Sequence, residues 1–204
     1  MKTIPEKEKL GKSFYRKKVL SVAKKLLGKT LVKKDGRTFL SGRIIEVEAY
    51  DGAIDQAAHS YGGITRRNEI MFGEGGYLYV YLSYGMHFCC NVVTGVKNKG
   101  TAVLIRAVEP LEGIRRMSQN RFGKKRSNEK EIYNLTSGPG KVCKAFGIER
   151  KHSGIDLTGE KIFILNSGLK ENEIIVSSKR IGITKSTDLP WRFYIKDNPY
   201  LSRK

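Results

Sequence analysis

The sequence predicts an α+β fold, in a single mixed domain with a curved, largely antiparallel sheet flanked by helices. Three observations favour this fold class. Apolar residues recur at helical spacing near the N-terminus, two strand-like segments flank a tight turn at residues 34–37, and strands and helices alternate further along the chain. No internal repeat or linker divides the 204 residues, so we expect one domain over residues 1–204.

The first elements follow from periodicity and from turn residues. A helix is predicted over residues 15–27, where valine, alanine and leucine repeat every three or four positions. Gly28 suits the position just after that helix, where a left-handed residue commonly ends the last turn. Strands are predicted at residues 30–32 and 38–48, and the charged residues 1–12 are expected to be frayed.

The later segments are predicted from composition. Residues 51–68 lack sustained periodicity and are expected to form a loop with a short helical piece. β-branched and aromatic residues predict strands at residues 77–83, 102–107, 162–165, 174–177 and 191–195. We expect one helix to begin within residues 112–117 and another to run from residues 137–141 to Phe146, ended by Gly147. The basic stretch 121–130 is predicted to be a mobile loop.

The composition indicates a polyanionic partner. Lys and Arg total 39 against 20 Asp and Glu, a net charge of +19, and nucleic acid is the commonest large polyanion. The three cysteines, Cys89, Cys90 and Cys143, form no C-x-x-C pair, so we predict neither a disulfide framework nor a metal site. With no apolar signal segment and no apolar run of about 20 residues, we expect a soluble cytoplasmic protein.

Two carboxylates lie within this basic sequence at a regular spacing. Glu46 and Glu48 occupy alternate positions of a predicted strand, so their side chains face the same side. One is a candidate general base for a water molecule and the other a candidate ion-pair partner. Two solvated carboxylates at a strand end are the alternative. Arg106 is a candidate partner whose charge favours an ionised carboxylate.

Aromatic residues follow these carboxylates along the chain. Four of them are suited to stacking against a nucleobase: Tyr50, His59, Tyr81 and Tyr84. Taking a base out of the duplex costs a few kcal/mol, and stacking contributes about 1–3 kcal/mol per base. Alternating tyrosines are also typical of the core face of a strand, an interpretation that stays open for Tyr77 and Tyr79. The leading hypothesis is an enzyme that acts on a nucleobase in DNA.

A series of motifs extends this hypothesis over most of the chain. They are Glu48-Ala49-Tyr50, Ala57-Ala58-His59-Ser60, Arg67-Asn68, Met71-Phe72, Tyr79-Val80-Tyr81, Tyr84-Gly85-Met86, Asn91, Leu104-Ile105-Arg106-Ala107, Glu109-Pro110-Leu111-Glu112-Gly113, Ser137-Gly138-Pro139-Gly140-Lys141-Val142-Cys143 and Arg192-Phe193-Tyr194. Together they resemble the alkyladenine (3-methyladenine) DNA glycosylase family, in its single-domain bacterial form. The similarity extends from about residue 14 to about residue 202. Each motif alone is weak, but their number and order are specific.

The resemblance implies a monofunctional DNA glycosylase of base-excision repair. Such an enzyme flips alkylated purines, such as 3-methyladenine and 7-methylguanine, out of duplex DNA and hydrolyses the bond between base and sugar, leaving an abasic site. Hypoxanthine is a further candidate substrate. Glu48 matches the base that activates water, Arg106 matches an arginine that helps to place that water, and the main chain at Ile181 matches another water contact. The family uses no metal or organic cofactor. We expect a monomer, associated with the nucleoid, that binds double-stranded DNA containing alkylated or deaminated purines.

The resemblance also assigns the residues around the flipped nucleotide. Tyr50, His59 and Tyr81 match the aromatic walls of the base pocket. Tyr84 matches the side chain that enters the minor groove and fills the gap left by the nucleotide. Asn91 matches a pocket residue that discriminates against the exocyclic amine of guanine.

Basic residues are candidates for contacts with the DNA backbone. Gly140 and Lys141 lie at a predicted helix start, where N–H groups and a lysine charge can bind a phosphate; Arg67 is assigned to the backbone with them. An ordinary helix start with Ser137 near the cap is the alternative. Six further cations either follow the DNA or form a solvated surface: Arg115, Arg116, Arg121, Lys124, Lys125 and Arg126.

Two other functions fit parts of the sequence. A non-catalytic RNA-binding or ribosome-associated protein is favoured by charge and aromatic content alone. A formyl- or methyltransferase-like enzyme is suggested by a likeness of the family's fold to a formyltransferase accessory domain, but no cofactor motif supports it. Release of a free base from methylated duplex DNA separates the glycosylase from both.

Overall fold

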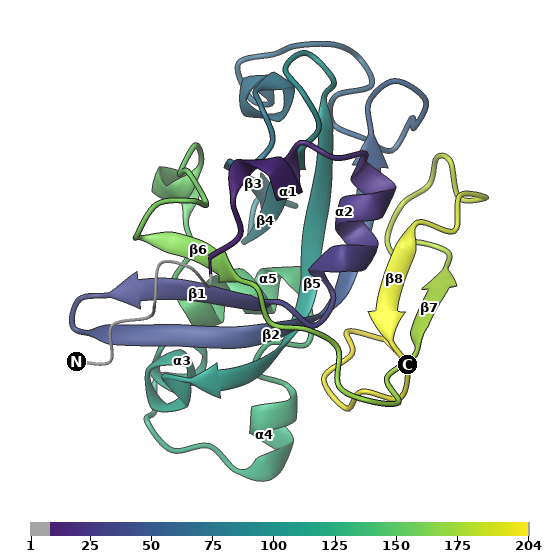
Figure 1. Cartoon of the computed structure of the whole chain (residues 1–204). Coiled ribbons are helices and arrows are strands. Elements are labelled where there is room, and N and C mark those ends of the chain that lie inside the picture. The colour runs from purple at the N-terminus through teal and green to yellow at the C-terminus, as the bar shows by residue number, and fades with distance from the viewer. Residues whose placement is uncertain (1–8, 204) are drawn as a thin grey trace.

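The computed structural model describes residues 9–203, which form a mixed α+β fold around one large sheet (Figure 1). The elements in chain order are α1 (Lys12–Tyr15), α2 (Val19–Leu26), β1 (Thr30–Asp35), β2 (Thr38–Asp51), the 3-10 helix η2 (Glu69–Phe72), β3 (Leu78–Ser83), β4 (His87–Thr94), β5 (Thr101–Glu112), α3 (Ile114–Phe122), α4 (Glu129–Tyr133), α5 (Pro139–Phe146), the 3-10 helix η3 (Arg150–His152), β6 (Ile162–Leu165), β7 (Ile175–Ser178) and β8 (Arg192–Ile195). The predicted fold class is therefore confirmed. Within residues 9–203, no helix is both long enough and apolar enough to cross a membrane.

The sheet owes its shape to the long strand β2. Within the described residues it has eight strands, paired antiparallel in the order β3-β4-β5-β2-β1-β6, with β7 and β8 attached beside β2. Along one edge, β2 pairs first with β1 and then, at Glu46 to Glu48, with β8. Its pairing with β5 shifts register on both sides of Glu46. Such bulges bend a strand and increase its twist, so the sheet curves as predicted.

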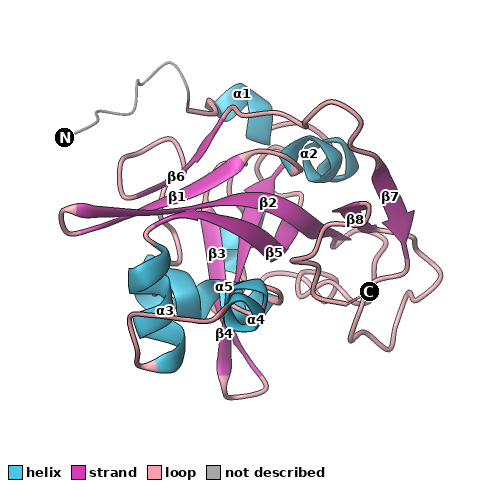
Figure 2. Ribbon diagram, turned by 90° about the horizontal axis from the view of Figure 1, so that it is seen from below, coloured by secondary structure: helices cyan, strands magenta, loops and turns pink. Residues whose placement is uncertain are grey.

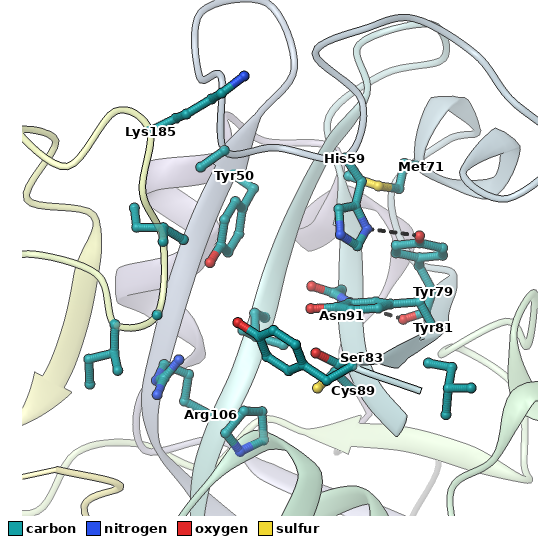
Figure 3. Close-up of a pocket in the computed structure, with 18 of the residues that line it drawn as sticks. Tyr50, His59, Met71, Tyr79, Tyr81, Ser83, Cys89, Asn91, Arg106 and Lys185 are labelled. Atoms are coloured by element: carbon teal, nitrogen blue, oxygen red, sulfur yellow. Dashed lines mark hydrogen bonds between the residues drawn. The ribbon is translucent and has the colours of Figure 1, made fainter. Parts of the chain in front are cut away.

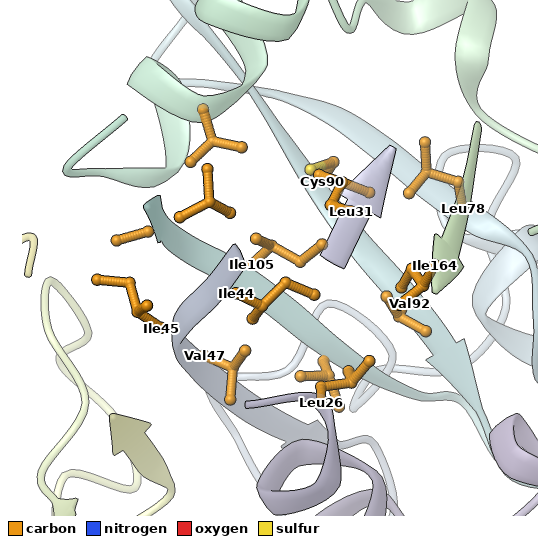
Figure 4. Close-up of a cluster of buried hydrophobic side chains, with 14 of the residues drawn as sticks. Leu26, Leu31, Ile44, Ile45, Val47, Leu78, Cys90, Val92, Ile105 and Ile164 are labelled. Carbon is orange, nitrogen blue, oxygen red and sulfur yellow. The ribbon is translucent and has the colours of Figure 1, made fainter. Parts of the chain in front are cut away.

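The helices cover both faces of this sheet. In Figure 2, α1 and α2 lie on one side of β1 and β2, and α3, α4 and α5 lie on the other. The core is built from fully buried aliphatic residues such as Leu26, Ile44, Val47 and Ile105 (Figure 4). Each such side chain contributes roughly 1.5–3 kcal/mol when it leaves water, so the core holds the central strands rigidly.

The single helix predicted over residues 15–27 is instead two helices, α1 and α2. The break follows Tyr15, whose carbonyl accepts a hydrogen bond from Gly95 N–H at 2.9 Å rather than from the next helical turn. The ring of Tyr15 is fully buried and packs edge-on against Phe14. Tertiary contacts therefore override the helical periodicity here. Gly28 has φ +83°, which confirms it as the left-handed residue after the helix.

Strand β4 was not expected from the sequence, although it supplies two cavity residues described below. It forms a hairpin with β3 through a loop of residues 84–86, in which Tyr84 and Gly85 have φ of +49° and +67°. Cys89 and Cys90 lie in β4 and are buried.

The loop predicted over residues 121–130 is wrong at both ends. Helix α3 continues to Phe122, and α4 begins at Glu129. Asn128 and Glu131 form a capping box, in which each side chain accepts a hydrogen bond from the other's main-chain N–H, at 2.9 and 3.0 Å. Lys124 pairs with Glu131 at 2.7 Å, so part of the basic charge is neutralised locally.

Smaller differences concern where elements begin. The prediction of a frayed N-terminus is wrong for residues 9–12, because Leu10 is buried and Lys12 opens α1; residues 1–8 lie outside the described residues. The helical piece expected within residues 51–68 follows that loop, as η2. Strand β5 extends to Glu112, so the next helix begins at Ile114.

Candidate active site

A cavity of about 620 Å³ opens beside the β3–β4 hairpin (Figure 3). Residues from β2, β3, β4 and β5 line it together with the loop at residues 51–68 and a loop at residues 179–186. Eight of the predicted site residues meet here: Tyr50, His59, Arg67, Tyr81, Tyr84, Asn91, Arg106 and Ile181. Segments far apart in the sequence therefore converge on one space.

Glu48 lies directly beneath this lining and is fully buried. One carboxylate oxygen accepts a hydrogen bond from Tyr50 OH at 2.8 Å, and the other accepts one from Ile181 N–H at 2.8 Å. Arg106 Nη1 is 3.2 Å from that second oxygen. These two hydrogen bonds and the ion pair all come from cavity-lining residues, and together they stabilise a negative charge at the floor of the cavity.

Glu46 lies on the same side of β2 as Glu48, as the strand spacing predicts, and both contact Arg106. Arg106 Nε donates to Glu46 at 3.0 Å. Burial acts to raise the pKa of Glu46, but a hydrogen bond from Ser202 N–H and the charge of Arg106 outweigh it and lower the pKa. Burial acts to lower the pKa of Arg106, but Glu48 and Glu46 outweigh it and raise the pKa.

Aromatic rings form two facing sides of the cavity (Figure 3). Tyr50 lies on one side, and His59, Tyr79 and Tyr81 lie on the other. The His59 and Tyr81 rings meet edge to face with centroids 4.4 Å apart, and Tyr79 and Tyr81 are stacked at 5.6 Å. A flat group between the two sides would contact aromatic surface on both faces. Tyr79 is 1% exposed, so it is a core residue and a cavity residue at once.

His59 is held by its neighbours in a defined environment. Its Nδ1 lies 3.1 Å from Tyr79 OH, and partial burial together with the charge of Arg67 lowers its pKa. The imidazole is therefore neutral near pH 7. Arg67 lines the cavity, with its guanidinium 5.6 Å from the centre of the Tyr81 ring.

Strand β4 contributes Asn91 and Cys89 to the cavity. Asn91 is buried, and its Nδ2 donates to the Tyr79 carbonyl at 3.2 Å, which fixes the side-chain amide. Burial raises the pKa of Cys89 to about 11, so this thiol is protonated at neutral pH and is no nucleophile.

The hairpin tip projects from the cavity mouth into solvent. Tyr84 is 83% exposed and Met86 is 72% exposed, the highest exposed fractions among the large hydrophobic residues that the structure describes. The tip is braced by α5, because Gly140 lies so close to His87 that an added Cβ would be 2.9 Å from His87 Cβ.

Lys141 and Gly140 lie next to the cavity rather than in its lining. Lys141 Nζ contacts Asn134 Oδ1 and lies 3.4 Å from Ser137 Oγ. The N-cap residue of α5 is Gly138, which directly follows Ser137. Burial and the charge of Arg121 lower the pKa of Lys141.

A buried ion pair behind Tyr50 was missed by the sequence analysis. The Arg180 guanidinium donates to both carboxylate oxygens of Asp55, and both side chains are 0% exposed. It also donates to the Ala49 carbonyl at 3.0 Å and to the Ser186 carbonyl at 3.2 Å. Its Cζ lies 4.6 Å from the centre of the Tyr50 ring. One side chain therefore fastens together β2, the loop with His59 and the loop with Ile181.

Comparison with known proteins agrees with this geometry. The model of the family described as methylpurine-DNA glycosylase (MPG) matches residues 13–199. A protein of Alkaliphilus oremlandii (strain OhILAs), named "Putative 3-methyladenine DNA glycosylase", is 52% identical over 202 residues, which cover 96% of this chain and all of that protein. Proteins of the same name from Desulfitobacterium hafniense (strain Y51) and Clostridium novyi (strain NT) are 47% and 49% identical, each over 97% of this chain and all of theirs. The chain belongs to the methylpurine-DNA glycosylase family and is a DNA N-glycosylase of alkylation repair.

Proposed function

We propose that this glycosylase excises 3-methyladenine and 7-methylguanine from duplex DNA, with Glu48 as the base that activates the attacking water. The observation that favours this is the position of Glu48, a carboxylate held by two hydrogen bonds and an ion pair beneath a cavity lined by aromatic rings. A carboxylate so placed lies below any purine that enters between Tyr50 and Tyr81.

Binding of the base follows from the aromatic cavity. Alkylation at N3 or N7 makes a purine cationic, and a cation is attracted to the electron-rich faces of tyrosine rings. Tyr50 lies on one side of the cavity and His59 and Tyr81 lie on the other (Figure 3), so a base between them would meet an aromatic ring on each face. The Asn91 side-chain amide is held by the Tyr79 carbonyl, and this fixed polar group discriminates against the exocyclic amine of guanine. Hypoxanthine is uncharged and needs a proton to leave well, so we expect it to be a weaker substrate.

The chemical step is hydrolysis of the base–sugar bond. Glu48 takes a proton from water as the water oxygen bonds to the anomeric carbon of the sugar. The bond between that carbon and the purine nitrogen breaks, and its electron pair leaves with the base, which neutralises the positive charge of an alkylated purine. The carboxylate also stabilises the positive charge that develops on the sugar. Arg106 and Ile181 N–H hold the carboxylate and the water in line.

Contacts with the rest of the duplex follow from the exposed residues. Tyr84, at the hairpin tip, is placed to enter the minor groove and fill the space that the flipped nucleotide leaves. Arg67, Gly140 and Lys141 are proposed to contact backbone phosphates. One chain contains the whole constellation, so we propose that it acts as a monomer.

Substitution of Glu48 by Gln tests the proposal. Single-turnover release of free base is measured on duplexes with 3-methyladenine, 7-methylguanine or hypoxanthine. We expect Glu48→Gln to abolish release while lesion-duplex affinity stays within a few-fold, because the amide keeps the shape but cannot accept the proton. Glu74→Gln, at an exposed carboxylate outside the cavity lining, is the matched control and should retain wild-type rates. Base release by Glu48→Gln would overturn the assignment.

A further inference from the structure

The end of the chain returns to the buried carboxylate of Glu46. Ser202 donates to it twice, from its main-chain N–H to one oxygen at 2.7 Å and from its hydroxyl to the other at 2.7 Å. The same hydroxyl oxygen accepts a hydrogen bond from Arg106 Nη2 at 3.2 Å. Ser202 therefore contacts Arg106 directly and also through Glu46.

A second arginine ties the following residue into the same cluster. Arg192 Nε donates to Glu46 at 2.8 Å, and its Nη2 donates to the Arg203 carbonyl at 2.9 Å. Arg192 is placed by β8, which pairs with β2 at this point, opposite Glu48. Ser202 and Arg203 are thus bonded to the two arginines that flank Glu46.

The residues just before Ser202 bring it to this position. Tyr200 and Leu201 pack against the hydrophobic core, and the centres of the Tyr200 and Tyr133 rings are 5.1 Å apart. Asn198 holds a turn, in which its side chain accepts from Tyr200 N–H at 3.0 Å. We call residues 200–203 the C-terminal strap.

The strap determines which guanidinium nitrogen of Arg106 is free to contact Glu48. The Nε of Arg106 is bonded to Glu46 and its Nη2 to Ser202, so Nη1 is the nitrogen turned toward Glu48. A guanidinium is planar, and two fixed edges set the direction of the third. Glu46 is fully buried, so its two oxygens depend on these protein donors rather than on water.

We propose that the C-terminal strap is a positioning element of the active site, in which Ser202 and Glu46 hold Arg106 in the orientation that sets Glu48 and its water. This inference rests on the proposed role of Glu48. Ser202 and Glu46 do not line the cavity, so they act on the chemical step and not on base binding. Loss of the strap admits water to Glu46 and lets Arg106 turn. A displacement of about 1 Å at a catalytic group can lower a rate by as much as about 100-fold.

The test is a truncation that ends the chain at Leu201, together with two point variants, Ser202→Ala and Ser202→Thr. Single-turnover base release and lesion-duplex affinity are measured below the unfolding temperature of each variant. We expect the truncation to slow release by about 10- to 100-fold and to change affinity by no more than a few-fold. Ser202→Ala should slow release less, because the main-chain donor remains, and Ser202→Thr should keep the rate within about twofold, because it keeps both donors.

A hydroxyl deletion elsewhere in the fold serves as the control. Ser167 Oγ bonds Thr30 Oγ1 at 2.8 Å, outside the cavity lining, so Ser167→Ala should leave the rate unchanged. Exchange of the Arg106 Nε–H proton, followed by nitrogen-15 NMR, gives a readout that does not depend on activity: it should accelerate in the truncated protein.

The outcomes separate this inference from the proposed function. If the wild-type protein releases no base, the proposed function fails and the exchange measurement still tests the strap. If the wild-type protein is active and the truncated protein matches it within twofold, the strap inference is overturned. If the truncated protein does not fold, Ser202→Ala decides the matter, and a wild-type rate for that variant overturns the inference.

Discussion

Replacement of Arg180 by Met should destabilise the protein strongly, because it leaves the carboxylate of Asp55 buried without its charge partner. The guanidinium makes both hydrogen bonds of the ion pair, and the Asp55 carboxylate also accepts one from Ala57 N–H at 3.0 Å. Both side chains are 0% exposed, so water cannot replace the lost partner without local opening.

The expected size of the effect follows from that burial. Removing one partner of a buried ion pair costs about 3–5 kcal/mol. In a chain of this length, 1 kcal/mol shifts the unfolding temperature by roughly 2–4 °C, so we expect a decrease of about 6–20 °C. The Arg180 guanidinium packs against the Tyr50 ring, and Arg180 is the residue before Ile181, whose N–H donates to Glu48. Base release should therefore also slow at temperatures where the variant is folded.

Thermal unfolding by circular dichroism measures the stability, and single-turnover base release measures the activity. The matched control is Arg16→Met, which breaks an exposed pair with Glu74 at 3.6 Å and should cost no more than about 1 kcal/mol. In the double variant Arg180→Met/Asp55→Leu no charge is left unpaired, so it should recover part of the loss. An Arg180→Met protein that unfolds within 2 °C of wild type, a shift of less than about 1 kcal/mol, would refute the reasoning.

Three further variants test other parts of the site. Tyr84→Ala should weaken lesion-duplex binding in an equilibrium titration, whereas Tyr61→Ala, another exposed tyrosine outside the cavity lining, should not; equal affinities would argue against a wedge. Gly140→Ala should lower the unfolding temperature, at a cost of about 1–3 kcal/mol, because its Cβ meets His87, while Gly62→Ala, which has open space, serves as control. The pKa of Glu46 is lowered by folding, so its ionised form stabilises the folded protein at pH values above its ordinary pKa of 4.5. That stabilisation is lost as the pH falls through the lowered pKa. On acidification below about pH 4.5, the unfolding temperature of the wild-type protein should therefore decrease more than that of Glu46→Gln. Equal decreases would contradict a stabilising role of ionised Glu46.

The sequence predicts the parts of the site that lie within local motifs. Glu48, Tyr50 and Arg106 belong to strands whose parity and residue types indicate their direction, and the structure brings them together. The Arg180–Asp55 pair could not be predicted, because its partners are 125 residues apart and its importance comes from burial that only the folded chain creates.

The structural misses have particular physical causes. Strand β4 follows a hairpin loop whose first residue, Tyr84, has a left-handed conformation, and at that first position the usual turn signal is Asn or Gly. For residues 121–130, positive charge suggested a loop, although the capping pair Asn128 and Glu131 was present in the sequence as a helix-start signal.

The alternation along β2 has a consequence for how this protein can change during evolution. Glu46 and Glu48 face Arg106 on one side, while Val47 and Ala49 belong to the hydrophobic core. Deleting or inserting a single residue between them would exchange the two sides, placing a carboxylate in the core and an aliphatic side chain beneath the cavity. This segment can therefore diverge by substitution but not by changes in length, and homologues that keep the activity should align through it without gaps.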